Sequence, residues 1–247
     1  MTLKCLGSSS RGNCYLLTDS DGKTLIVEVG VSIADIKRAL HFDISGVIGC
    51  LITHRHKDHS KSLKDVLTWG VPVLALSDVF DSADIKNRVF CKEVEPMRGY
   101  IVGNFKVLVL PASHDVPCVG FIIEHPEMGK LLFVTDTMMV EWKLPKLDHI
   151  MIEANYSDDI LRENISNGSV PGVLRSRLLH SHLELGTLKE VLRINDISNV
   201  KELILMHLSG TNSGGDMELI HEIEKSSGKP IYIAKSGFEL KISNTPY

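Results

Sequence analysis

Short apolar runs separated by turns make up much of the chain. Runs of roughly four to eight apolar residues bounded by Gly, Ser or Asn predict strands. Two such runs, residues 3–7 and 13–18, are joined by the turn Ser-Ser-Ser-Arg-Gly. Further strands are predicted at 24–30, 46–53, 71–76, 105–110, 118–124, 130–135, 149–154, 201–207, 230–234 and 238–242.

Four segments carry helical spacing instead. They are residues 32–40, which begin at a Ser N-cap, residues 60–70, which end at Gly70, and residues 185–195 and 215–228. No repeat and no Pro/Ser-rich linker interrupts the pattern. It therefore predicts one α/β domain over residues 1–247, with two sheets packed face to face and helices outside. A doubly wound sheet is the alternative that periodicity leaves open.

The bulk composition narrows the class of protein. The chain of 247 residues is 43% hydrophobic, with a net charge of -4 and a pI of about 6.3. Because proteins that grip long nucleic acids usually carry a basic excess, we expect no stable nucleic-acid partner, although a local basic patch is compatible with this average. The five cysteines are scattered and form no Cys-x-x-Cys pair, which is typical of a reducing cytosol.

Neither a signal peptide nor a membrane span is expected. The first residues lack an apolar core, and no apolar run approaches the roughly 20 residues of a membrane-crossing helix. We therefore expect a cytoplasmic protein without a membrane partner.

The candidate chemistry lies directly after the strand predicted at 46–53. His54, His56 and Asp58 alternate along the chain, so in extended backbone their side chains point to the same side, and His59 follows. Neutral imidazoles and carboxylates are good ligands for zinc and related divalent ions. A solvated charged loop is the alternative, but it would suit a single His-x-His better than this set.

Three more candidate ligands come at the ends of later predicted strands: His114, Asp136 and His207. One such residue alone is more often a packing or capping residue. The order of all three residues after the His-x-His-x-Asp-His run resembles the ligand pattern of the metallo-β-lactamase superfamily. The resemblance extends over essentially the whole chain. It implies an αββα sandwich, with two mixed sheets flanked by helices and a two-metal site at one edge.

The resemblance also implies roles for these residues. One ion would bind His54, His56 and His114, the other would bind Asp58, His59 and His207, and Asp136 would bridge them. Zinc is the expected metal, with manganese and cobalt as alternatives. Two residues depart from the family pattern: Lys57 stands where many relatives carry a small residue, and Glu28 where they often carry Asp. Glu28 and Asp115 are candidates to orient the imidazoles.

The superfamily cleaves lactams, thioesters and phosphodiesters, so other residues must decide the reaction. Lactam-cleaving zinc relatives usually lack an aspartate at the position of Asp58. Thioesterases of the glyoxalase II type carry a helical C-terminal tail, whereas this chain ends in strand-like segments. The segment between Asp136 and His207 is too short for the large inserted domain of one RNA- and DNA-cutting branch.

A phosphodiesterase role is favoured by two residues that resemble motifs of tRNase Z-type enzymes. There, a Glu orients a His that protonates the leaving oxygen, and Glu153 and His182 match these positions. The match is partial, because Ser181 replaces a Gly and Leu183 follows the His. A paired strand-end carboxylate and a helix-start histidine are the alternatives. We assign proton delivery to His182 held by Glu153, and orientation of the nucleophile to Asp58.

The N-terminal pattern Gly-Ser-Ser-Ser-x-Gly-Asn at 7–13 resembles a bacterial exonuclease-like branch. It also resembles phage-encoded relatives that degrade cyclic nucleotides and thereby silence the Pycsar antiviral system. The stretches 49–65, 131–137, 150–161 and 206–213 look like the same phage group. The resemblance predicts hydrolysis of a cyclic mononucleotide to a linear monophosphate as a phage counter-defence. It also implies a homodimer, since relatives often complete each site from a partner subunit.

Several points stay open at this level. Free N–H groups of the serine loop suit an anion beside the metals, and a plain tight hairpin suits the sequence equally. Substrate contacts are assigned by proximity alone, with ordinary surface loops as the alternative: Asn155, Tyr156, Ser209 and Asn212. A DNA or RNA exonuclease is the second enzyme hypothesis, which a continuous basic groove leading to the metals would favour. A nucleotide-binding protein without catalysis is a third, and the complete ligand set argues against it.

Overall fold

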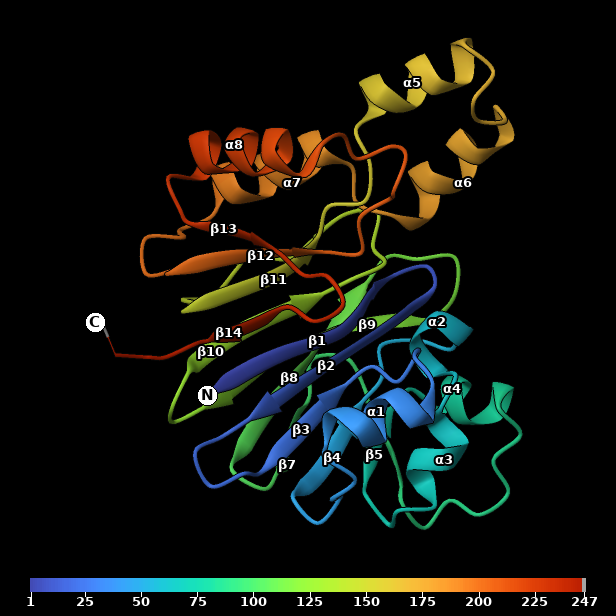
Figure 1. The fold of residues 1–247 in the computed structure, drawn as a ribbon, viewed down its shortest axis with the longest axis vertical. Helices are drawn as coiled ribbons and strands as arrows, with labels where there is room; N and C mark the ends of the chain where they lie inside the picture. The colour runs from blue at the N-terminus through green and yellow to red at the C-terminus, as the bar shows by residue number, and fades with distance from the viewer. Residues whose placement is uncertain (246–247) are drawn as a thin grey trace.

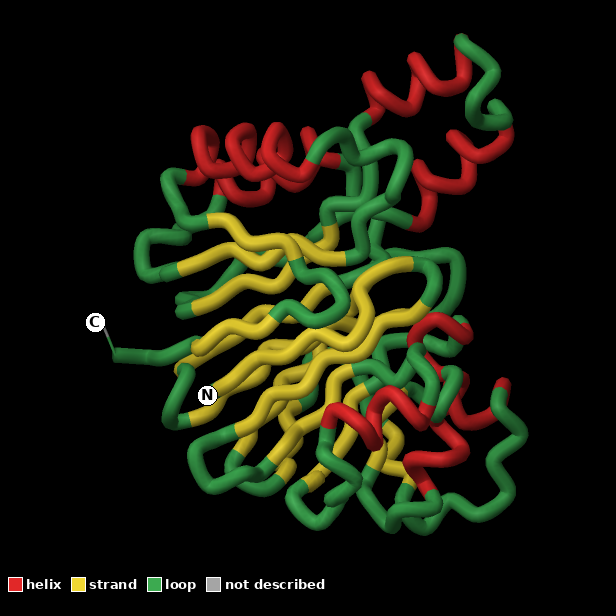
Figure 2. Tube along the Cα trace, viewed as in Figure 1, coloured by secondary structure: helices red, strands yellow, loops and turns green. Residues whose placement is uncertain are grey.

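The computed structural model describes residues 1–245, so the last two residues of the predicted 1–247 domain lie outside the described part. Two seven-stranded sheets pack face to face, and helices cover their outer faces (Figures 1 and 2). The αββα prediction is confirmed, and the doubly wound alternative is wrong.

The first sheet has the order β14-β1-β2-β3-β4-β5-β6. Its strands bury both faces because alternate side chains point to opposite sides. In β2, Tyr15 and Leu17 contact the core between the sheets, while Cys14 and Leu16 contact the outer helices. The strands are β1 (Thr2–Ser9), β2 (Gly12–Thr18), β3 (Thr24–Val27), β4 (Val47–Leu51), β5 (Val73–Ala75), β6 (Cys91–Glu93) and β14 (Glu239–Lys241).

The second sheet has the order β13-β12-β11-β10-β9-β8-β7. Strands β10 to β13 run parallel, so their carboxyl ends meet at one edge of the sheet. Asp136, Glu153 and His207 lie at that edge. The strands are β7 (Gly99–Val102), β8 (Phe105–Ala112), β9 (Cys118–His125), β10 (Gly129–Val134), β11 (His149–Glu153), β12 (Glu202–Met206) and β13 (Ile231–Ile233).

Six helices cover the two outer faces (Figure 1). Over the first sheet lie α1 (Ile33–Ala39), α2 (Lys57–Ser60), α3 (Leu63–Leu67) and α4 (Ser77–Ser82); over the second lie α7 (Leu185–Ile194) and α8 (Asp216–Ser227). The predicted N-cap is confirmed, since the Ser32 side chain accepts a hydrogen bond from Asp35 N. Within residues 1–245 no helix combines the length and apolar character needed to cross a membrane.

The single helix predicted at 60–70 is wrong, because the structure has α2 and α3 with a break between them. In a continuous helix Ser62 N would donate to the carbonyl of Asp58. It donates instead to Val29 O, at 2.9 Å, and the Asp58 carbonyl accepts a hydrogen bond from Asn13 Nδ2 at 3.2 Å. Bonds to the preceding loop therefore replace the helical bond at this point.

Helices α5 (Asp158–Ser166) and α6 (Val173–Ser181) were not predicted. Together they form a helical arm, residues 158–181, that projects away from both sheets at the upper right of Figure 1. The arm packs on a small core of its own: Tyr156, Leu161, Val170 and Leu178. In α6, Leu178 is buried whereas Val173 and Leu179 are exposed. Its apolar residues therefore form no single stripe, and periodicity gave no signal. The short elements α4, β6 and β7 were missed as well.

Candidate metal centre

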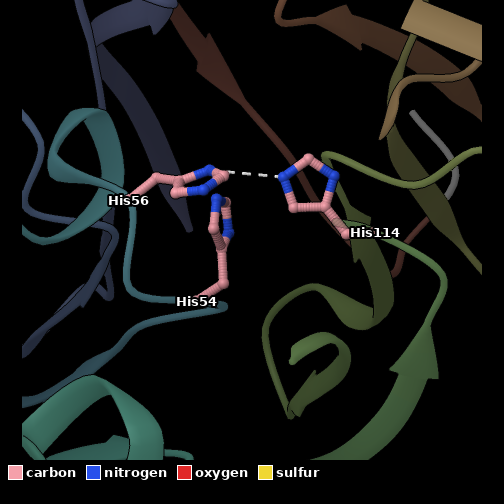
Figure 3. Close-up of side chains that lie close together, drawn as sticks. All are labelled: His54, His56 and His114. Carbon is pink, nitrogen blue, oxygen red and sulfur yellow. Dashed lines mark hydrogen bonds between the residues drawn. The ribbon is translucent and has the colours of Figure 1, made fainter. Parts of the chain in front are cut away.

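Three histidines form the first ligand group (Figure 3). His54 and His56 follow β4, and His114 follows β8. His114 Nε2 lies 3.3 Å from His56 Nδ1, and the His54 ring centroid lies 4.7 Å from that of His56 and 4.8 Å from that of His114. Each ring offers one nitrogen to a shared point.

The second group brings together Asp58 and His59 from α2 with His207 from the end of β12. Asp58 Oδ2 lies 3.3 Å from His59 Nε2 and 3.5 Å from His207 Nε2. Both rings are buried, whereas the Asp58 side chain is 22% exposed. One carboxylate oxygen thus lies between two imidazole nitrogens at the mouth of the site.

Asp136 lies between the two groups. Its Oδ2 is 3.9 Å from His54 Nε2 and 3.8 Å from His114 Nε2. Its Oδ1 is 3.4 Å from His59 Nε2 and 3.7 Å from His207 Nδ1. Each oxygen faces a different group, which is the arrangement that a carboxylate bridging two ions requires.

The donor set fits two divalent ions. Within residues 1–245, His54 Nε2 and His207 Nε2 are buried and lack a hydrogen-bond partner. A buried polar atom without a partner costs free energy, and a bound cation satisfies it. Imidazole and carboxylate donors suit zinc, manganese and cobalt alike. The clusters therefore fit a dinuclear metal site, without identifying the metal.

The charges in the site favour a cation between the rings. Burial lowers the pKa of His54 well below its usual value, with a further contribution from His59, so His54 is in the neutral form that binds metals. Burial also opposes a charge on His207, but the nearby carboxylates of Asp136, Asp58 and Glu153 raise the pKa of His207 to about 10. A divalent ion that binds here displaces that proton.

One buried carboxylate supports both ligand groups. Glu28 Oε1 accepts a hydrogen bond from Thr53 Oγ1 at 2.5 Å, and Thr53 Oγ1 in turn accepts from His54 Nδ1 at 2.9 Å. The same oxygen lies 3.4 Å from His59 Nδ1. Because both Nδ1 atoms face the Glu28–Thr53 side, the Nε2 atom of each ring faces the site.

Two of the remaining ligands are held by oxygen atoms of distant segments. His114 Nδ1 donates to the carbonyl of Ser181, at 2.7 Å, at the end of the helical arm. The backbone N–H of His207 donates to Ser8 Oγ, at 2.9 Å, in the β1–β2 hairpin. The serine pattern therefore forms a tight hairpin that braces a ligand, while anion binding by it stays a prediction.

The supporting residues Ser8, Asn13, Gly30 and Thr53 were missed at the sequence level. Asn13 Nδ2 lies 3.1 Å from His59 Nε2, besides its bond to the Asp58 carbonyl. At Gly30, an added Cβ would lie 1.6 Å from the Asp58 carbonyl oxygen, so the position tolerates only glycine. Two signals were present: Thr53 directly precedes the ligand run, and Ser8 and Asn13 belong to the serine pattern at 7–13, whose bracing role was not foreseen.

Backbone conformation also distinguishes the site. Glu28, Asp136 and His207 have φ values of 65°, 48° and 54°, in the left-handed region that non-glycine residues rarely adopt. Each follows the last residue of a strand within two positions. The sharp turn directs these side chains to the shared edge, and such outliers cluster at functional sites.

Glu153 and His182 lie directly against the metal ligands. His182 Nδ1 donates to Glu153 Oε1 at 2.6 Å, and the His182 ring stacks on His207 with centroids 5.3 Å apart. Glu153 is fully buried, and its Oε2 accepts hydrogen bonds from the backbone N–H of Thr137 and of Leu183. Burial opposes a charge on His182, but Glu153 raises the pKa of His182 above its usual value.

Three of the four predicted substrate contacts are buried. Asn155 Nδ2 donates to the carbonyl of His207 at 2.8 Å, Tyr156 packs in the core of the arm, and Asn212 accepts a hydrogen bond from Asn164. Ser209 is half-buried and lines a cavity beside the serine hairpin. Contact of these four residues with substrate stays a prediction.

Replacing Glu28 with Gln is expected to weaken metal binding about 10- to 100-fold, the usual cost of losing a group that orients metal ligands. The amide keeps the shape of the side chain but supplies only a weak, neutral acceptor to Thr53 and His59. Competition titration with a chromophoric chelator measures the affinities of both sites.

Glu28→Asp is the matched control. It keeps a carboxylate, and Asp tolerates positive φ better than most residues, so it should retain more affinity than Glu28→Gln. Equal affinity in wild type and Glu28→Gln would contradict the bracing role.

Known proteins share this architecture. The sequence model of the metallo-beta-lactamase superfamily matches residues 9–143, which is more than half of the chain. Over 224 residues the chain is 26% identical to a Bacillus anthracis protein named exodeoxyribonuclease YycJ, and the match covers 84% of this chain and 82% of that protein.

Solved structures resemble the whole described fold. The metallo-beta-lactamase fold protein YhfI from Bacillus subtilis matches with a TM-score of 0.73 at 18% identity, covering 97% of this chain and 98% of that one. The short form of human tRNase Z matches with a TM-score of 0.66 at 14% identity, covering 98% and 99%. At such identities the likeness concerns the fold.

Proposed function

Because this chain belongs to the metallo-β-lactamase superfamily and is a hydrolase, we propose that it is a two-metal phosphodiesterase that converts cyclic mononucleotides to linear monophosphates. The observation that carries the phosphodiesterase chemistry is the buried Glu153–His182 pair beside the ligands. A ribose alkoxide is a poor leaving group, so its departure needs a positioned acid, which contributes typically about 10²- to 10⁴-fold.

Asp58 and His182 each carry out one of the two proton transfers. When bound, two divalent ions supply an activated water and neutralise the negative oxygens of the phosphate. Asp58, at the mouth of the site, orients that water and accepts its proton. His182 delivers a proton to the ribose oxygen as its bond to phosphorus breaks, and Glu153 holds the ring through Nδ1 so that Nε2 faces the leaving oxygen. One water is consumed for each ester bond broken.

Support for a cyclic nucleotide comes from the sequence. The ligand run, the strand end before Asp136, the Glu153 stretch and the stretch after His207 all resemble phage-encoded enzymes that degrade cyclic nucleotides. The same resemblance supports a homodimer acting in the host cytoplasm as a counter-defence against cyclic-nucleotide signalling. A relative named as an exodeoxyribonuclease supports the broader class of nucleotide phosphodiester substrates.

The test is incubation of metal-loaded protein with cyclic mononucleotides, cyclic oligonucleotides, and single- and double-stranded DNA, with products separated by chromatography. Linear monophosphates from the cyclic mononucleotides are expected for the wild type. They should be absent with His56→Ala, which removes one ligand of the first group.

Two outcomes would overturn this proposal. Release of nucleotides from DNA, with the cyclic mononucleotides intact, would identify an exonuclease and leave the two-metal site standing. Tight binding of a cyclic nucleotide without turnover, by protein that holds both metals, would identify a binding protein.

A further inference from the structure

An exposed carboxylate lies beside the first ligand group. Asp115 belongs to the loop 113–117, which joins β8 to β9, and its side chain is 44% exposed. Its Oδ1 lies 3.1 Å from His114 Nε2 and 3.5 Å from His56 Nε2. It lies outside the compact group that the three histidines form. Neither the two ligand groups nor the proton transfers assign it a function.

The carboxylate of Asp115 contacts the two rings from different sides. His56 and His114 face each other through His56 Nδ1 and His114 Nε2, which are 3.3 Å apart (Figure 3). Asp115 therefore lies behind the His56 ring, where carboxylates that orient a metal ligand bind, but in front of the His114 ring. The rear nitrogen of His114, Nδ1, already donates to the carbonyl of Ser181. An orienting role thus explains the contact with His56 and leaves the contact with His114 unexplained.

The nitrogen of His114 that Asp115 faces carries no hydrogen in the neutral ring. Because Nδ1 donates its hydrogen to Ser181, Nε2 presents a lone pair. Two carboxylate oxygens face that lone pair: Asp115 Oδ1 at 3.1 Å and Asp136 Oδ2 at 3.8 Å. Three electron-rich atoms repel one another unless a cation lies among them. The position is therefore suited to a metal ion with Asp115 as one of its ligands.

The second ligand group contains the same arrangement. Its His59 Nε2 faces Asp58 Oδ2 at 3.3 Å and Asp136 Oδ1 at 3.4 Å. One oxygen of the central Asp136 thus belongs to each group, and each group adds one carboxylate of its own. Asp115 has the same place beside His114 that the candidate ligand Asp58 has beside His59.

The loop leaves the Asp115 carboxylate free to move. The base of the loop is fixed, since the backbone N–H of Ser113 donates to Thr137 Oγ1 at 3.0 Å and the carbonyl of Ser113 accepts from Met138 N at 2.8 Å. Within residues 1–245, the Asp115 carboxylate itself contacts only the two imidazoles. It can leave them without breaking a bond that holds the loop.

We propose that Asp115 is a further ligand of the first ion, the one bound by His54, His56 and His114, and that it holds the position which the phosphate of a substrate takes. Catalytic metal sites keep one position open to substrate, and Asp115 lies on the exposed side of this group. A carboxylate and a phosphate both offer anionic oxygen, so only one of them occupies that position. The ligand role rests on the two-metal site, and the exchange rests on the proposed phosphodiesterase chemistry.

Metal titration of Asp115→Ala tests the ligand role. Competition with a chromophoric chelator resolves two binding steps, and His114→Ala and Asp58→Ala identify the steps of the first and the second ion. We expect Asp115→Ala to weaken the first-ion step at least about tenfold, the lower end of the loss seen for residues that only support a ligand. Asp115→Asn, which keeps one oxygen donor, should lose less affinity.

The matched control is Asp65→Ala. Asp65 is exposed and lines the cavity that also includes His56 and Asp58, so the variant removes the same charge close to the site without removing a contact to a ring. Both of its binding steps should match those of the wild type.

Inorganic phosphate is the probe for the exchange. Calorimetric titration of phosphate into protein that holds both ions should show about fivefold tighter binding to Asp115→Ala than to wild type, because a negative charge a few ångströms from the phosphate is removed. Loss of a residue that only orients His56 would leave phosphate binding equal or weaker. The same change therefore weakens metal binding and strengthens phosphate binding.

Three results would overturn the inference. They are wild-type metal affinities in Asp115→Ala, loss of the second-ion step instead of the first, and phosphate binding that is no tighter than in wild type. Thermal unfolding identifies a variant that fails to fold, and Asp115→Asn then decides the question. Neither titration uses a nucleotide, so failure of the cyclic-nucleotide assay would overturn only the proposed substrate.

Discussion

An Asp136→Ala protein is expected to bind about one divalent ion per chain where the wild type binds two, and to lose hydrolysis to background. Among residues 1–245, Asp136 is the one carboxylate whose two oxygens face both ligand groups. Without it, two cations about 3.5–4 Å apart would repel one another with no shared anion between them. Metal content after a chelator wash, together with turnover of the preferred nucleotide, measures both effects.

Asp136→Asn distinguishes the effect of the carboxylate charge from the effect of the side-chain shape. The amide keeps one oxygen donor and the side-chain volume, so it should show intermediate metal content and little turnover. Thermal unfolding with excess zinc identifies any variant that fails to fold. Two ions retained by Asp136→Ala with wild-type affinity would rule out the bridge.

His182→Ala is expected to lower kcat by about 10²- to 10⁴-fold while leaving the metal content at the wild-type value. The ring donates to Glu153, stacks on His207 and belongs to neither of the two ligand groups defined above, although it forms a third cluster of ligand-like spacing with Asp136, Glu153 and His207. Unchanged metal content would show that this third cluster holds no ion. Its loss removes the acid and spares the site that activates water. Steady-state kinetics and metal analysis on one preparation check both parts.

A change of leaving group distinguishes proton delivery from packing. A phosphodiester with a nitrophenolate leaving group departs without protonation, so His182→Ala should slow its hydrolysis only a few-fold. An equally large loss on both kinds of ester would mean that His182 acts by positioning its neighbours.

The candidate ligands could be predicted from sequence because their geometry is local. Alternation in extended chain accounts for His54 and His56 but not for Asp58, which lies in the first turn of α2 and joins the second ligand group. Parallel strands carry Asp136 and His207 to one edge. The structure brings these residues together, while their roles remain to be tested by the experiments above.

The supporting contacts could not be predicted because they join segments that are distant in sequence. The link from Glu28 through Thr53 to His54 depends on how β3 and β4 pair. The break at Ser62 depends on a hydrogen bond to Val29, which no helical propensity reveals. The helical arm was missed for a different reason. Its buried apolar residues pack in a separate small core and not against a sheet.

The pairing of β1 with β14 has a consequence for biosynthesis. The register joins Thr2 to Lys241, and Ser8 at the other end of β1 supports His207. On the ribosome, β1 emerges long before β14, so its free edge stays exposed to other chains until translation has passed β14. The metal centre is likewise incomplete until His207 has emerged. A nascent chain therefore lacks the complete ligand set, and chaperone capture during synthesis is most useful along β1.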